Sequence, residues 1–128
     1  MKIEDIFNFF KSCQTLFLSN ELAVCYIAFV LVHGDSYGTE LMRRLEVEYP
    51  GCRLSDTILH HSLKFLMREE IVTTYLQRVD GRGRPRRMYQ IQPGAKQQAQ
   101  ELARFWQEYM ERSVSRSVSH TTTLQPQS

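Results

Sequence analysis

The chain has 128 residues, a mass of 15.1 kDa and an ordinary globular composition (42% hydrophobic, 23% charged), which allows one domain with a modest core. Its net charge of +2 excludes a bulk polycation, so any affinity for nucleic acid has to come from where charge is placed. Three widely spaced cysteines suggest no disulfide framework, the apolar run at 22–32 is too short to span a bilayer, and no signal peptide is recognisable, so we expect a cytoplasmic protein without a membrane partner.

Residues 1–18 are predicted to form an N-terminal amphipathic helix, because Ile3, Phe7, Phe10 and Phe17 recur at helical spacing. The polar face of this helix carries acidic and amide side chains. A helix that lies on a membrane surface would need a strongly basic face instead. We therefore expect this helix to pack on the body of the protein or on a partner.

Three further helices are predicted in succession, over residues 19–33, 36–49 and 55–70. The first is almost continuously apolar, which is typical of a central core helix. Pro50-Gly51 ends the second helix, and Ser55 can cap the third. The order and spacing of these helices indicate a compact helical core.

A short turn, residues 51–54, joins the second and third of these helices, as in a helix-turn-helix motif. In that motif the second helix enters the major groove and its N-terminal residues reach base edges. Adjacent histidines point about 100° apart on a helix, so they are not expected to bind one metal ion together, and no metal site is predicted. The residues of this recognition helix that we expect to contact DNA are Ser55, Thr57, His60, His61 and Lys64.

A β-hairpin follows, with strands predicted over 72–78 and 88–91. The connecting loop carries four arginines in six residues, and no acidic residue lies between Gly81 and Gln90. A solvated turn would account for the glycines and the proline, but an unopposed basic cluster repels itself. Because the planar guanidinium suits phosphate oxygens, we predict a DNA-binding wing that uses Arg82, Arg84, Arg86 and Arg87.

A long final helix is predicted over 93–112, opened by Pro93-Gly94 and striped with apolar residues. One small domain is not expected to cover the apolar stripes of both flanking helices by itself, so we expect the first and last helices to form a homodimer. The expected interface residues are Phe7, Phe10, Leu102, Phe105, Trp106 and Tyr109. Residues 113–128 are rich in Ser and Thr and are predicted to be a disordered tail, because they cannot bury enough surface to offset their ordering entropy.

Several segments together resemble the PadR-like winged-helix transcriptional regulators, and they cover about residues 20–112. The most specific one runs from Gly83 to Gly94, because the wing of that family typically reads Gly-Arg-Pro-Arg-Lys/Arg-x-Tyr. The resemblance implies a homodimeric transcription factor, usually a repressor, that pairs largely through its C-terminal helix. The matching segments are 36–46, 54–66, 69–72 and 83–94.

The chain departs from the family pattern at two places. Leu59-His60-His61 replaces the common Leu-Tyr-Arg of the recognition helix, so the operator sequence is not carried over. Glu70 replaces the usual glycine before the strand, which is expected to change only the helix end. The added N-terminal helix and the His-His pair are also similar to a cyanobacterial member that lengthens the circadian period, which implies repression of a clock gene.

We therefore predict a mainly α-helical fold with a small β-hairpin: a winged helix-turn-helix over 19–92, with an added N-terminal helix and a long C-terminal dimerisation helix. The predicted function is homodimeric, sequence-specific repression at an inverted-repeat operator in double-stranded DNA, with no catalytic activity and no cofactor. Two alternatives stay open. One is a ligand-responsive repressor of detoxification genes, in which Trp106 would stack a planar effector; the other is a winged-helix protein-interaction module that does not bind DNA.

Overall fold

The computed structural model describes residues 1–6, 16–78 and 83–122, with side chains described as far as Arg112. The mainly α-helical fold with one β-hairpin and a long last helix is confirmed. Its elements are β1 (Leu16–Phe17), α2 (Asn20–Leu31), α3 (Gly38–Glu48), β2 (Cys52–Arg53), α4 (Asp56–Arg68), β3 (Val72–Gln77), β4 (Arg86–Ile91), a 3-10 turn (Pro93–Ala95) and α5 (Lys96–Thr122).

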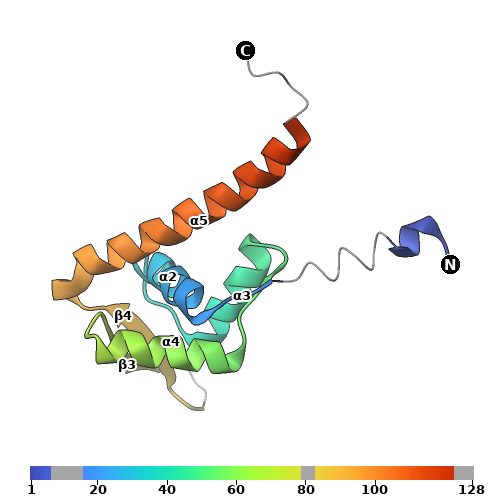
Figure 1. The fold of residues 1–128 in the computed structure, drawn as a ribbon. Coiled ribbons are helices and arrows are strands. Elements are labelled where there is room, and N and C mark those ends of the chain that lie inside the picture. The colour runs from blue at the N-terminus through green and yellow to red at the C-terminus, as the bar shows by residue number, and fades with distance from the viewer. Residues whose placement is uncertain (7–15, 79–82, 123–128) are drawn as a thin grey trace.

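Helix α2 is the centre of the fold. It lies between α5 on one side and α4 on the other, with α3 beside it (Figure 1). Ser19 caps its start by accepting a hydrogen bond from the Leu22 N–H at 3.2 Å. Because seven of its twelve residues are buried, α2 supplies the surface on which the other helices pack.

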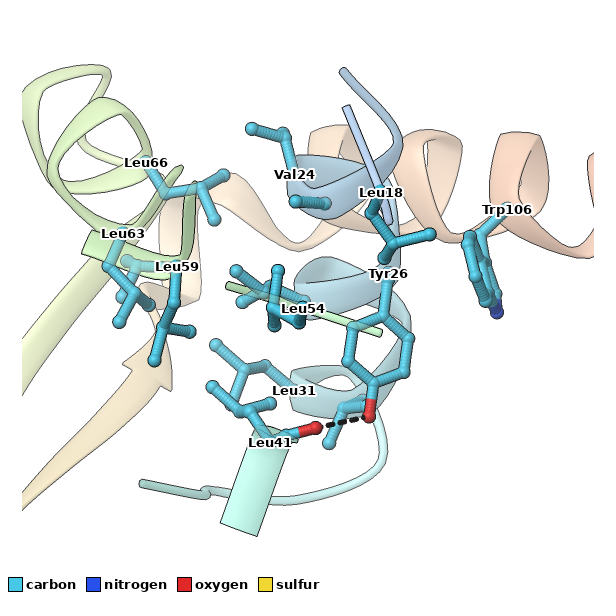
Figure 2. Packing of buried hydrophobic residues seen from close by; sticks show 14 of the residues in the cluster. Leu18, Val24, Tyr26, Leu31, Leu41, Leu54, Leu59, Leu63, Leu66 and Trp106 are labelled. Atoms are coloured by element: carbon cyan, nitrogen blue, oxygen red, sulfur yellow. Dashed lines mark hydrogen bonds between the residues drawn. The ribbon is translucent and has the colours of Figure 1, made fainter. Parts of the chain in front are cut away.

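The core brings together side chains from every helix of the domain. Leucines from α4 face those from α2 and α3 across the interior (Figure 2). The Tyr26 hydroxyl donates a hydrogen bond of 2.8 Å to the Leu41 carbonyl, which satisfies a buried polar group and ties α2 to α3. None of the helices in the described ranges is long and apolar enough to cross a membrane.

An aromatic cluster fixes α5 on the body. Trp106 is fully buried, and its ring meets those of Tyr26 and Tyr49 edge-on, each with 5.2 Å between centroids. The expectation that Trp106 belongs to a dimer interface is therefore wrong, because its own chain already covers the whole side chain. Helical spacing identifies an apolar face but does not tell whether the domain or a partner covers it.

The predicted N-terminal helix over 1–18 is wrong at its C-terminal end. Residues 3–6 are helical, but β1 pairs in parallel with β2, in the register Leu16↔Cys52 and Phe17↔Arg53. The Leu18 N–H donates to the Arg53 carbonyl at 3.0 Å, and its side chain is buried, so the segment is extended to reach the core. Residues 7–15, with Phe7 and Phe10, lie outside the described residues.

The disordered tail expected at 113–128 stays a prediction, although α5 continues from the expected end at 112 through Thr122. The composition of this segment limits what it can bury, but a helix that has already formed extends at the gain of one hydrogen bond per residue. No glycine or proline interrupts the sequence between Lys96 and Thr122. Residues 123–128 lie outside the described residues.

Candidate nucleic-acid interface

Helix α4 begins at the predicted cap. The Ser55 hydroxyl accepts a hydrogen bond of 3.2 Å from the Ile58 N–H, and Asp56 lies in the first turn. The acidic side chain is favourable there because the helix N-terminus carries a partial positive charge. This cap sets the position of the helix start, which is the part of a recognition helix that reaches base edges.

The two faces of α4 differ sharply. Leu59, Leu63 and Leu66 are buried against the core, and they hold the helix in place. The four recognition residues predicted within the helix are all exposed on the outer face. One shallow hollow of about 410 Å³ runs over this face, and it is lined by these four residues together with Asp56. The structure thus brings these predicted side chains onto one surface.

A larger groove of about 680 Å³ lies between α2, α4 and α5. Val24, Phe65 and Leu102 give it apolar walls, and His61 and Lys64 line it as well as the shallow hollow. Its size is in the range of small-molecule sites. Within the described residues, no cluster of three His, Cys, Asp or Glu side chains could hold a metal ion.

The joint between α4 and β3 contains a residue with an unusual backbone conformation. Glu70 has φ = 61°, in the left-handed region. Its N–H donates to the Met67 carbonyl at 3.0 Å, and the Ile71 N–H donates to the Leu66 carbonyl at 2.9 Å. This pair of hydrogen bonds is the Schellman termination of a helix, which most often uses glycine at the left-handed position. The joint turns the chain directly from the recognition helix into the wing.

Strands β3 and β4 pair antiparallel over six positions, from Val72↔Ile91 to Gln77↔Arg86. The second strand begins two residues earlier than predicted, so Arg86 and Arg87 belong to the strand and not to the loop. Because side chains alternate along a strand, these two arginines lie on opposite faces of the hairpin. Arg84 is exposed in the loop, and Arg82 lies outside the described residues.

The loop between α2 and α3 holds the wing through three consecutive residues, Asp35, Ser36 and Tyr37, which we call the wing anchor. Asp35 Oδ2 accepts hydrogen bonds from the Tyr75 hydroxyl (2.6 Å) and the Gln90 amide (3.4 Å). The bond to Asp35 raises the pKa of Tyr75, because it favours the protonated phenol.

The backbone of Ser36 pairs with that of Tyr89, with N···O distances of 3.2 and 2.8 Å. Helix α3, the first helix of the helix-turn-helix, therefore begins at Gly38, two residues after the expected start near Ser36, because Ser36 extends the sheet instead. The Arg86 guanidinium carbon lies 4.0 Å from the centroid of the Tyr37 ring. Sequence patterns did not identify this anchor, because its partners are 40 to 55 positions away along the chain.

The residues expected at a dimer interface divide into three groups. On α5, Phe105 is 53% exposed, whereas Leu102 and Tyr109 are half-buried. Trp106 is inside the domain, and the two N-terminal phenylalanines are not described. The C-terminal part of α5 projects beyond the rest of the domain (Figure 1).

A family model described as the transcriptional regulator PadR-like family matches residues 27–101. The structure of the circadian clock associated protein Pex from Anabaena is 50% identical, with a TM-score of 0.78, over 89% of this chain and 99% of that chain. Pex from Synechococcus sp. is also 50% identical, with a TM-score of 0.78, over 86% of this chain and 98% of that one.

The fold likeness extends to more distant structures. PadR from Bacillus subtilis, solved in complex with operator DNA, is 19% identical, with a TM-score of 0.52, over 61% of this chain and 44% of that one. At this identity the likeness concerns the fold alone. No curated protein sequence matches the chain.

Proposed function

Because the chain belongs to the PadR-like family of transcriptional regulators, we propose that it binds an inverted-repeat operator as a homodimer and represses transcription. One observation carries this proposal. Helix α4 and the arginine-bearing hairpin lie side by side, and α2 lies between α4 and α5 (Figure 1). A groove-reading helix next to a basic hairpin is the arrangement that a winged helix needs on duplex DNA.

In this proposal α4 selects the sequence. Thr57, His60, His61 and Lys64 offer hydroxyl, imidazole and ammonium groups to the base edges of the major groove. The Ser55 hydroxyl is engaged in the cap, so its proposed part is to place the helix start close to the DNA backbone. The operator therefore differs from that of family members with tyrosine and arginine at positions 60 and 61.

The wing supplies affinity that does not depend on sequence. Arg84 is exposed and able to reach phosphate oxygens, and Arg82 is proposed for the same role on its sequence position. Arg87 lies on the other face of β4 from Arg86, so the two arginines are proposed to approach the duplex from different sides of the hairpin.

The dimer is proposed to form through α5 and the N-terminal segment. The exposed Phe105 and the half-buried Leu102 and Tyr109 leave apolar surface on the part of α5 that docks on the domain, and a second copy would cover this surface. Phe7 and Phe10 are proposed to join this interface. A two-fold axis would then place the two recognition helices about 34 Å apart, one turn of the duplex.

We propose further that the regulated gene belongs to a circadian clock. The support is the 50% identity with two solved proteins named Pex, one of them described as associated with the circadian clock, over nearly their entire length. Repression of a clock gene by this chain would alter the period of the rhythm.

The test is fluorescence anisotropy with labelled duplexes that tile the upstream regions of clock genes, together with light scattering of the free protein and of the complex. We expect one duplex with an inverted repeat to bind more tightly than the others, with two chains per duplex. In a reporter strain, the same promoter should become more active when the gene for this chain is deleted. A protein that binds no duplex above the nonspecific level would instead fit a protein-interaction module.

A further inference from the structure

The wing anchor touches both strands of the hairpin on one face. Asp35 contacts Tyr75 of β3 and Gln90 of β4, and Tyr37 contacts Arg86 of β4. Tyr75 pairs with Met88, so Tyr75, Arg86, Met88 and Gln90 share the face that meets the wing anchor, where Met88 is buried. The opposite face of the hairpin packs against the core through Val72, Tyr89 and Ile91. Arg86 is therefore held near the domain, whereas Arg87 points away from that face.

Arg86 is held by stacking on an aromatic ring and not by an ion pair. Its guanidinium lies over the Tyr37 ring, and both residues are half-buried. The ion pairs within the described residues involve Arg44, Arg53 and Arg104, so none of them neutralises Arg86. A guanidinium over an aromatic ring keeps its N–H donors available at the guanidinium edge, and the contact removes part of the rotamer freedom that binding would otherwise have to remove.

We propose that Tyr37 is a positioning residue for DNA binding: its ring holds the Arg86 guanidinium so that the edge meets a phosphate of the operator. This inference rests on the proposed function, and it adds a residue that lies in neither the recognition helix nor the wing. The ring, and not the hydroxyl, is the group that matters, because the cation lies over the ring face. Among the strand arginines, Arg86 is thus preorganised and Arg87 is not.

The test compares full-length variants in anisotropy titrations on the operator duplex at several salt concentrations. Tyr37→Leu removes the ring and is expected to weaken binding about five- to tenfold, the range of a partly exposed cation–π contact. Because a phosphate contact is lost, the slope of log K against log salt should become shallower by about one. Tyr37→Phe keeps the ring and should bind as the wild type does.

A double-mutant cycle separates positioning from a general structural role. Arg86→Ala should weaken binding at least as much as Tyr37→Leu, and the double variant should bind no worse than Arg86→Ala alone. Arg87→Ala is the matched control, since its loss should add to that of Tyr37→Leu. The unfolding midpoint of every variant is measured by circular dichroism to confirm that it is folded at the assay temperature.

The outcomes are distinguishable. Additive losses in the cycle, or an unchanged salt slope in Tyr37→Leu, would overturn the positioning role, as would a Tyr37→Phe variant that binds as weakly as Tyr37→Leu. If Tyr37→Leu does not fold, the cycle is run with Tyr37→Phe and Arg86→Lys, where the proposal requires normal binding by the first and weakened binding by the second. Wild-type protein that binds no duplex would overturn the proposed function itself.

Discussion

The recognition helix and the wing lie next to each other, yet they are held in place by different kinds of contact. Helix α4 rests on three buried leucines; the Ser55 hydroxyl caps its start, and backbone hydrogen bonds terminate its end. The wing relies on Val72 and Met88 for burial and on three anchor residues for its orientation. An element held by the core can change its outer side chains without moving, whereas an element held by a few polar contacts moves when one of them is lost.

The largest effect is expected where the recognition helix meets the core. Leu66 is fully buried, so Leu66→Ala should lower the free energy of unfolding by about 2–5 kcal/mol, through lost burial and the cavity left behind. Phe65→Ala is the matched control, since Phe65 is 38% exposed and its loss should cost less than about 1 kcal/mol. Urea unfolding measures both. Equal losses in the two variants would contradict the view that the core holds α4.

The next effect concerns sequence choice. His60→Ala and His61→Ala each remove an exposed side chain, so stability should stay within about 0.5 kcal/mol of the wild type. If the imidazole contacts a base, operator binding should weaken by about 1–3 kcal/mol while binding to an unrelated duplex stays unchanged. Competition titrations with operators altered one base pair at a time measure this. A parallel loss on every duplex would assign the histidine to the DNA backbone instead.

A smaller and qualitatively different effect is expected in the wing loop. Arg84 is exposed, so Arg84→Ala should leave stability unchanged. Operator and unrelated duplexes should weaken by the same factor, and the salt slope should fall by about one for each lost phosphate contact. The measurement is the same titration series at rising salt. Loss confined to the operator would show that this arginine reads sequence, which would break the contrast between the two regions.

The smallest effect is expected at the joint between the two regions. Glu70 adopts φ = 61°, where a side chain costs about 1–2 kcal/mol relative to glycine. Replacing Glu70 with glycine removes this backbone strain, but glycine also has more conformational freedom to lose from the unfolded chain. Glu70→Gly should therefore stabilise the protein by about 0.5–1 kcal/mol. DNA affinity should not change, because Glu70 lies on neither contact surface. A destabilised variant would mean that the carboxylate makes a contact that outweighs the backbone strain.

The sequence predicted those features that depend on local chemistry. The Ser55 cap, the apolar face of α4 and the glycine-containing hairpin follow from residue types and their spacing, and all three are confirmed. The exposed positions of Thr57, His60, His61 and Lys64 follow from the same periodicity, and the structure places them on one surface. Their contacts with DNA stay a prediction.

The features that the sequence did not predict depend on contacts between distant residues. Trp106 belongs to the core because Tyr26 and Tyr49 lie against it, and neither residue is near it in the chain. Leu16 and Phe17 form a strand because β2 offers them a parallel partner. Likewise, helical periodicity placed the start of α3 near Ser36. In the structure Ser36 instead pairs with Tyr89 of the hairpin as an isolated antiparallel bridge. Local patterns carry no information about such partners.

The burial of Trp106 also sets the order in which a growing chain can complete this domain. Tyr26 and Tyr49 are synthesised long before the residue that covers them. At about 5–20 residues per second, translation from Tyr49 to Trp106 lasts on the order of several seconds. During that interval both halves of the helix-turn-helix have emerged while the face of α2 that receives α5 is still open to solvent. The surface proposed to read DNA is therefore made before the helix that stabilises it, and the nascent chain becomes a complete regulator only once α5 has docked.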